Sequence, residues 1–223
     1  MEFKEYPDRE LAVMSLADKL ASDLRKLLAN SEQVSIAGPG GTTPGPVFDA
    51  LSAAELDWSR VTVMLTDERW VPDDNPRSNA GLVRARLLQG PAAAATFVPF
   101  YRHGQSADAA ANLLSQELSG HFPLSLVLLG MGADMHTASL FPGAPELDAA
   151  LSRHAPAFCA VTPDSQPEKR ITLSARVLDE ALEKHVVIFG ADKRVALEMA
   201  QALEPSQAPI NAVLQGSIVH WAN

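Results

Sequence analysis

The chain has 223 residues, of which 47% are hydrophobic, and it carries a formal net charge of -9 with a pI near 5.1. This acidity argues against nucleic-acid binding, because phosphate backbones require a basic face. No apolar run reaches the length of a membrane span, and the N-terminal region is charged and amphipathic, so we expect a cytoplasmic protein with no membrane partner. The single cysteine, Cys159, excludes an internal disulfide and argues against structural zinc.

The first predicted elements are a helix, a strand and a glycine loop. The helix follows Asp8, and the strand spans residues 34–37. The loop at 38–44 leads into a second helix, with Thr43 suited to the N-cap and Pro44 to the first turn. Unpaired backbone N–H groups at such a helix start favour a phosphate, although the loop lacks a P-loop lysine and also fits a plain tight turn. The apolar residues of the first helix recur at helical spacing: Val13, Leu16, Ala17, Leu20, Leu24, Leu27 and Leu28.

A second buried strand at 61–66 also ends in polar residues, beginning with Asp67. Two prolines and several polar residues predict a loop over 71–78, and Ser78 or Asn79 starts the next helix. Arg77 lies where it can swing over a ligand. We expect the neighbouring acids to be solvated: Glu68, Asp73 and Asp74.

The apolar run from Leu126 to Leu129 predicts a central strand covered on both faces. Gly130 and Gly132 then allow a sharp turn at its carboxyl end, where open parallel sheets bind ligands. Asp134 and His136 follow two positions apart, as an acid/base pair would. Taken alone, such a pair is more often a turn cap beside an ordinary loop histidine.

Strands and helices alternate along the rest of the chain, which predicts one α/β domain over residues 1–223. We expect a mostly parallel sheet flanked by helices on both faces, a Rossmann-like three-layer sandwich. Lys193 falls in the first turn of a helix that Asp192 is expected to cap. A cation at a helix N-terminus is unfavourable beside the positive end of the helix dipole. A nearby bound anion would explain the presence of Lys193 there, and chance would explain it equally well. The remaining predicted elements are strands at 97–100, 157–161, 170–173, 185–190 and 218–221 and helices at 107–118 and 174–182.

Four ordered motifs resemble the 6-phosphogluconolactonase family and together cover most of the chain. The resemblance implies hydrolysis of 6-phosphoglucono-1,5-lactone in the oxidative pentose phosphate pathway, without metal or organic cofactor. It also implies the fold shared with glucosamine-6-phosphate deaminases. One departure is Met135, where the family usually has glycine; a positive φ there would cost about 1 kcal/mol or more. The motifs are residues 40–44 (GGTTP), 66–72 (TDERWVP) with Ser78 and Asn79, 130–143 (GMGADMHTASLFPG) and 170–173 (RITL).

Two alternative functions remain open beside the lactonase. In a glucosamine-6-phosphate deaminase the corresponding motif has a glutamate where this chain has Phe141, which cannot transfer a proton. A sugar-phosphate-sensing regulator on a similar domain would need an effector surface, commonly a DNA-binding segment, and this acidic chain begins with the domain's first helix.

For the lactonase we expect one end of the site to bind phosphate and the other to activate water. Binding of the substrate is assigned to Gly40, Gly41, Thr42, Thr43, Asp67, Arg170 and Lys193, and catalysis to His136, Asp134 and Arg77. His136 is the expected general base, and Asp134 orients it or holds a substrate hydroxyl. Arg77 closes over the substrate, and Asp67 binds a sugar hydroxyl or orients Arg77. Backbone amides at the glycine turns stabilise the oxyanion. Ser139 is expected to be structural, and the partner is a phosphorylated sugar lactone bound by a monomer or weak homodimer.

Overall fold

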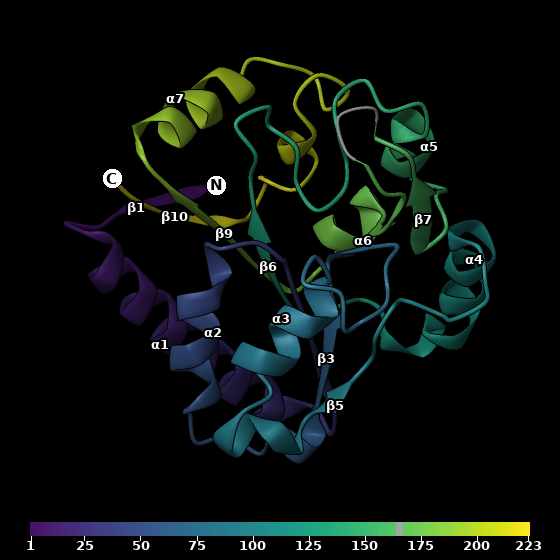
Figure 1. The fold of residues 1–223 in the computed structure, drawn as a ribbon. Coiled ribbons are helices and arrows are strands. Elements are labelled where there is room, and N and C mark those ends of the chain that lie inside the picture. The colour runs from purple at the N-terminus through teal and green to yellow at the C-terminus, as the bar shows by residue number, and fades with distance from the viewer. Residues whose placement is uncertain (164–166) are drawn as a thin grey trace.

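The computed structural model describes residues 1–163 and 167–223, and its centre is a seven-stranded sheet in which all neighbouring strands are parallel (Figure 1). The strand order is β1-β10-β9-β6-β2-β3-β5. The strands of this sheet are β1 (Glu2–Glu5), β2 (Val34–Gly38), β3 (Val61–Leu65), β5 (Thr96–Phe97), β6 (Leu126–Gly130), β9 (Glu183–Phe189) and β10 (Ile218–Ala222).

The α-helices lie between the strands in sequence, as βαβ connections require. Their bounds are α1 (Arg9–Asn30), α2 (Pro44–Ser52), α3 (Asn79–Arg86), α4 (Ala107–Glu117), α5 (Leu147–Leu151), α6 (Ala175–Asp179) and α7 (Ala191–Ala200). Short 3₁₀ helices join them: η1 (Trp58–Arg60), η2 (Gly90–Ala94), η3 (Ser119–His121) and η4 (Pro209–Ala212).

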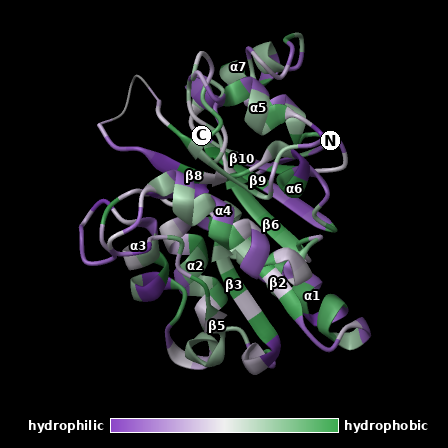
Figure 2. Cartoon of the chain, turned by 90° about the vertical axis from the view of Figure 1, so that its right-hand side faces the viewer, coloured by the Kyte–Doolittle hydropathy of each residue, from purple (hydrophilic) through white to green (hydrophobic). Residues whose placement is uncertain are grey.

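The central strands are buried on both faces, which explains their unbroken apolar sequences. Every residue of β2 and β3 is buried, and β6 is coloured hydrophobic along its length in Figure 2. A strand flanked by helices on both faces has no polar side, so alternation of polar and apolar residues is lost. The core therefore lies along β9, β6, β2 and β3, and their carboxyl ends open at one edge.

Helices cover both faces of the sheet, as predicted. α1 packs against α2 and β10, and its Asp23 reaches His185 of β9. On the opposite face Arg194 of α7 lies over the ring of Trp221 in β10. The α1 helix begins as the sequence predicts, because the Asp8 carboxylate accepts the Leu11 N–H at 2.8 Å. Within the described residues, no helix has both the length and the apolar composition needed to cross a bilayer.

A second, three-stranded antiparallel sheet lies beside the first and was not predicted. It consists of β4 (Asp67–Arg69), β8 (Arg170–Leu173) and β7 (Phe158–Val161), in the order β4-β8-β7. β4 follows β3 almost directly, so the chain leaves the large sheet and enters the small one at the same carboxyl edge. Asp67, Arg69 and Arg170 are held there on paired backbone.

Several local predictions are wrong. The chain opens with β1 ahead of its first helix. Thr43 has helical dihedral angles and makes no side-chain capping bond. Asp192 lies inside the first turn of α7, whose N-cap position is Gly190. Glu68 is fully buried rather than solvated, because it accepts hydrogen bonds from four donors. The sequence also predicts a polar loop over residues 162–169, of which residues 164–166 lie outside the described part of the chain.

Candidate active site

A cavity of about 310 Å³ opens at the carboxyl ends of β2, β6 and β9 and beside β4. Its size suits a small phosphorylated sugar. The residues that line it converge from segments far apart in the sequence, which the parallel topology brings to one edge. Most of the residues predicted to form the site line this cavity: Gly40, Gly41, Thr42, Thr43, Asp67, His136, Arg170 and Lys193.

One wall of the cavity is the glycine loop between β2 and α2. A Cβ atom on Gly40 would lie 1.8 Å from Oδ1 of Asn79, so only glycine allows this close approach. Asn79 is held by its Nδ2, which donates to the Asp67 carbonyl oxygen at 2.8 Å. Proline at positions 44 and 46 removes two amide donors from the helix start, which leaves the N–H groups of residues 41–43 and 45 for an anion.

Three cationic side chains line the cavity. Nζ of Lys193 donates to the Met131 carbonyl oxygen at 2.9 Å, which ties α7 to the turn after β6. Arg170 is buried and pairs with Asp67 at 3.5 Å, and burial lowers the pKa of its guanidinium although Asp67 acts in the opposite direction. Nη1 of Arg69 donates to the Arg77 carbonyl oxygen at 2.7 Å. The Nε of Arg69 is buried and has no hydrogen-bond partner among the described residues.

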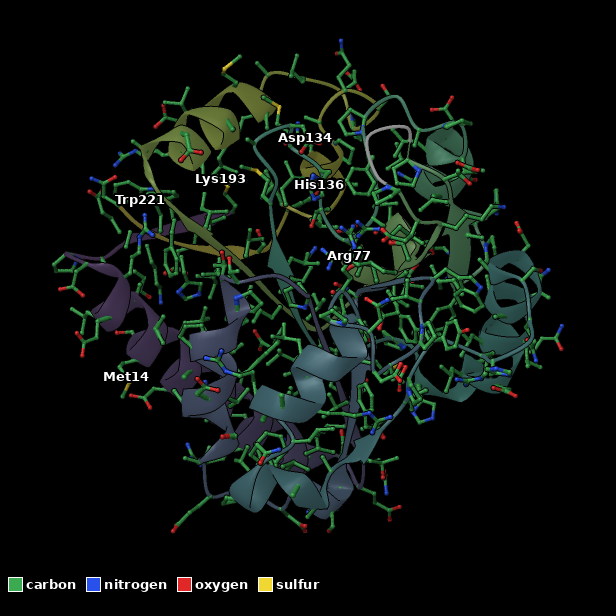
Figure 3. The ribbon with its side chains drawn as sticks, in the orientation of Figure 1. Met14, Arg77, Asp134, His136, Lys193 and Trp221 are labelled. Atoms are coloured by element: carbon green, nitrogen blue, oxygen red, sulfur yellow. The ribbon has the colours of Figure 1, made fainter. Side chains whose placement is uncertain are left out.

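His136 and Asp134 form a hydrogen-bonded pair at the rim of the cavity (Figure 3). Nδ1 of His136 lies 2.5 Å from Oδ1 of Asp134, and the backbone N–H of His136 donates to the same oxygen at 3.3 Å. Burial raises the pKa of the Asp134 carboxyl, but the hydrogen bond and charge of His136 outweigh this and leave the pKa below its usual value. The carboxylate therefore accepts the Nδ1 proton, and Nε2 is left as the basic nitrogen. Asp134 itself does not line the cavity.

The turn that carries this pair is closely packed. A Cβ atom on Gly132 would lie 2.1 Å from Nδ1 of His136, and the Gly132 N–H donates to the His136 carbonyl oxygen at 2.9 Å. The amide of Gly132 is thus already used and is not available to an oxyanion. Met135 has a φ of +66°, so methionine occupies a left-handed position. Such a residue costs about 1 kcal/mol or more, which the contacts of the turn offset.

Ser139 lies outside the cavity lining and contacts Asp67, which belongs to that lining. The Ser139 hydroxyl is fully buried and donates to Oδ2 of Asp67 at 2.6 Å. Oδ1 of Asp67 accepts from the Thr66 hydroxyl at 3.2 Å. Ser139 therefore fixes the carboxylate that pairs with Arg170, and its buried hydroxyl is committed to that carboxylate.

Arg77 lies outside the cavity lining. Its guanidinium makes two contacts of 2.8 Å with the Glu168 carboxylate, and its side chain is 44% exposed. Arg69 and Asn79 line the cavity instead, although the sequence analysis assigned neither of them a role. Arg69 belongs to the same motif as Asp67, two residues away, so alternation along a strand was the signal that could have placed both on one face.

Known proteins of similar sequence share this fold. The family model described as glucosamine-6-phosphate isomerases/6-phosphogluconolactonase matches residues 7–221. A 6-phosphogluconolactonase of Mesorhizobium japonicum is 43% identical, with 97% of this chain and 93% of that protein covered. The corresponding protein of Pseudomonas aeruginosa is 41% identical over 92% of this chain and 88% of its own length. The crystal structure of a 6-phosphogluconolactonase from Shewanella baltica superposes with a TM-score of 0.95 at 34% identity, covering 100% of this chain and 98% of that one. The chain therefore belongs to the glucosamine-6-phosphate isomerase/6-phosphogluconolactonase family.

Proposed function

We propose that this protein hydrolyses 6-phosphoglucono-1,5-lactone to 6-phosphogluconate, the second step of the oxidative pentose phosphate pathway. The observation that carries the proposal is the Asp134–His136 pair at the rim of a cavity lined by three cations. The names of the relatives support the same reaction. The proposed chemistry requires neither a metal nor an organic cofactor.

The reaction begins with general base catalysis by His136. Nε2 of His136 takes a proton from water as the water oxygen attacks the lactone carbonyl carbon, which gives a tetrahedral oxyanion. When the intermediate collapses, the bond from this carbon to the ring oxygen breaks, and the imidazolium returns its proton to that oxygen. Asp134 holds the imidazole in the tautomer that this sequence of steps requires.

Arg69 is the proposed donor to the developing oxyanion. Its buried Nε lacks a partner among the described residues, and its position is fixed through the Arg77 carbonyl oxygen. A donor that is already held in place can stabilise charge in the transition state without reorganising. Arg77 acts through this carbonyl, and its guanidinium remains the candidate for closure over bound substrate if the ion pair with Glu168 opens.

The phosphate group is proposed to lie against the start of α2. The amides of Gly41, Thr42 and Thr43 supply directed donors there, and Gly40 allows the loop to approach Asn79. Arg170 and Lys193 add positive charge. Asp67 holds Arg170 in place and presents its remaining surface to a sugar hydroxyl.

Phe141 favours the lactonase over the deaminase. Its buried ring lies 4.4 Å from the His136 ring, between centroids, at the position where the deaminase motif has its glutamate. The ring shields the imidazole and offers no second acid/base group. Lactone hydrolysis needs only one such group, whereas isomerisation with loss of ammonia needs more.

The test is an assay of lactone disappearance. The substrate is generated in situ from glucose 6-phosphate, and the spontaneous rate is subtracted. We expect the enzyme-dependent rate to saturate with substrate and ammonia release from glucosamine 6-phosphate to be absent. Hydrolysis no faster than the spontaneous rate would contradict the proposed lactonase function. Release of ammonia from glucosamine 6-phosphate would support the deaminase function instead. Binding of sugar phosphate without either reaction would indicate a sensing domain.

The remaining expectations stay predictions. We place the protein in the cytoplasm, as one domain over residues 1–223, with a phosphorylated lactone as its partner and with neither nucleic acid nor membrane bound. We also expect a monomer or weak homodimer.

A further inference from the structure

The strand β1 forms one outer edge of the large sheet (Figure 1). Among the described residues it pairs with β10 on one side only, and Glu2 and Phe3 are exposed. An unpaired edge presents a row of backbone N–H and C=O groups to which another strand can add.

The hydrogen bonds to β10 show which backbone groups face outward. The Glu2 N–H donates to the Ser217 carbonyl oxygen at 2.8 Å, and the Tyr6 N–H donates to the Trp221 carbonyl oxygen at 2.9 Å. In a parallel ladder alternate residues bond to the same neighbour. The even-numbered residues of β1 therefore face β10, and Phe3 directs its N–H and C=O away from the sheet.

We propose that a second copy of this chain adds to this edge, with β1 paired to β1 in antiparallel fashion around a two-fold axis at Phe3. In this register Phe3 faces Phe3 of the other copy, and the two residues exchange both backbone hydrogen bonds because their outward groups oppose each other. Glu2 then lies directly opposite Lys4 of the second copy, twice by symmetry. The seven-stranded sheets of the two copies become continuous across the axis.

Charge selects this register over its neighbours. An axis at Lys4 would oppose two lysines, and an axis at Glu2 would oppose two glutamates; like charges directly opposite each other are destabilising. Edge charges usually deter pairing. Here the order of acid, aromatic and base makes the same charges complementary to themselves. Within one copy Nζ of Lys4 already lies 3.4 Å from Oε1 of Glu2. On dimer formation each residue would exchange this contact for the same contact with the other copy.

Exposed apolar side chains flank the edge and would be covered by a second copy. Phe3 is 37% exposed and stacks on Trp221, with Arg194 over both rings. The first turn of α1 follows β1 in the chain and is tied to the end of β10, because Nε of Arg9 donates to the Asn223 carbonyl oxygen at 2.9 Å. That helix exposes Leu11 and Met14, which lie three residues apart on one face, and Figure 3 shows Met14 on the same side of the molecule as Trp221.

Sedimentation equilibrium of the full chain, from micromolar to millimolar concentration, tests the proposal. We expect a reversible monomer–dimer equilibrium that Lys4→Glu weakens at least about tenfold, because two attractive pairs become repulsive. The double variant Glu2→Lys with Lys4→Glu restores the complementary pairs and should return the dissociation constant to within about threefold of the starting value. Arg25→Glu makes the same net-charge change at an exposed position of α1 and should leave the equilibrium unchanged.

The outcomes separate this interface from others. A chain that stays monomeric throughout the concentration range overturns the proposal. So does a dimer that Lys4→Glu and Arg25→Glu affect equally, or one that the double variant fails to restore. Circular dichroism of each variant, together with its rate of lactone hydrolysis, confirms that the fold is intact, because none of these residues lines the cavity.

Discussion

At the scale of single residues, the bond between His136 and Asp134 determines which nitrogen can act as a base. Because the Asp134 carboxylate accepts the Nδ1 proton, Nε2 is unprotonated when the imidazole is neutral. His136→Gln should lower kcat by about 10²- to 10⁴-fold and leave KM nearly unchanged, since general base catalysis is worth about that much. Stopped-flow measurement of lactone loss with the blank subtracted provides the rate; a variant with near-normal kcat would rule out His136 as the base.

Lys193 is expected to act on binding of the phosphate. Lys193→Ala should raise KM strongly for the phosphorylated lactone and change any activity on unphosphorylated gluconolactone very little. The physical reason is that the ammonium attracts an anion that only the first substrate carries. Parallel kinetics on both lactones check this, and equal losses would show that the residue supports the fold or the turn at Met131 instead.

Variants of Arg69 and Arg77 together test which arginine stabilises the proposed oxyanion. Arg69→Ala should lower kcat on both lactones by about 10²-fold or more, as the loss of one fixed donor does in other acyl-transfer sites. Arg77→Ala keeps the carbonyl oxygen that holds Arg69 and should reduce kcat/KM much less. If the Arg77 variant were the more damaged of the two, closure over the substrate would be its main role and Arg69 would be secondary.

Sequence reasoning placed the Asp134–His136 pair and the glycine loop at the same edge of the sheet, because each follows directly on a strand end, where local pattern determines position. The sequence analysis assigned a role to Arg77 and none to Arg69. The two arginines differ mainly in their contacts in the folded protein, which the local sequence does not reveal. Glu168 lies 91 residues from Arg77 along the chain, and nothing near Arg77 in the sequence predicts that ion pair.

At the scale of elements, Glu68 joins β4 to the start of α3. Its carboxylate accepts from the backbone N–H groups of Asn79 and Ala80, the hydroxyl of Ser78 and the backbone N–H of Arg69. Burial raises the pKa of this carboxyl although the four hydrogen bonds act to lower it. The acid was predicted to be solvated because a glutamate two residues past a strand usually is, and the capping contact appears only once α3 folds back.

Glu68→Ala should lower the free energy of unfolding by roughly 2–4 kcal/mol, because several buried donors lose their acceptor. Urea denaturation followed by circular dichroism measures the change. Asp74→Ala, at an exposed acid in the loop between β4 and α3, is the control and should stay within about 0.5 kcal/mol of the starting protein. Similar losses in both variants would mean that loop charge, and not the helix cap, stabilises this region.

The strands that sequence reasoning missed share one cause. β1 and β4 are short and polar. Each forms a strand because it pairs with a strand far away in the sequence, β1 with β10 and β4 with β8. The buried strands β2, β3 and β6 were predicted with nearly correct bounds, because burial on both faces imposes an apolar run that is visible locally.

At the scale of the whole molecule, a buried chain of hydrogen bonds links α1 to the far strands of the sheet. Asp23 accepts from Nε2 of His185, Nδ1 of His185 faces Nε2 of His220 at 3.1 Å, and Nδ1 of His220 lies 2.8 Å from the Tyr6 hydroxyl. Only one proton fits between the two rings, so His185 and His220 cannot both be cationic. Burial lowers the pKa of His185 to about 4, against the effect of Asp23, and that of His220 to about 3.

Stability should therefore fall as the solution becomes acidic. Both folded pKa values lie below the unfolded value of about 6.5, so the unfolded chain binds protons first. The contribution is fully present above about pH 6.5 and is lost as pH falls to about 4 for His185 and about 3 for His220, with a slope of up to about 1.4 kcal/mol per pH unit for each histidine. Denaturation curves between these pH values measure it.

His220→Gln removes one titrating ring and should flatten this pH dependence, whereas His103→Gln at an exposed loop position should not. An unchanged slope in the His220 variant would mean that carboxylates, and not the buried rings, cause the loss of stability in acid.

The pairing of β1 with β10 also constrains the order in which the chain can fold during synthesis. Among the described residues, residues 2–5 pair only with residues of β10, so β10 must be translated before β1 can dock. At roughly 5–20 residues per second, that strand waits for about 10–45 s on the ribosome. Throughout this time β10 does not yet exist, and the edge of the nascent sheet is β9 or an earlier strand. Of the strands in this sheet, β10 is translated last, and it provides the edge with which β1, translated first, then pairs.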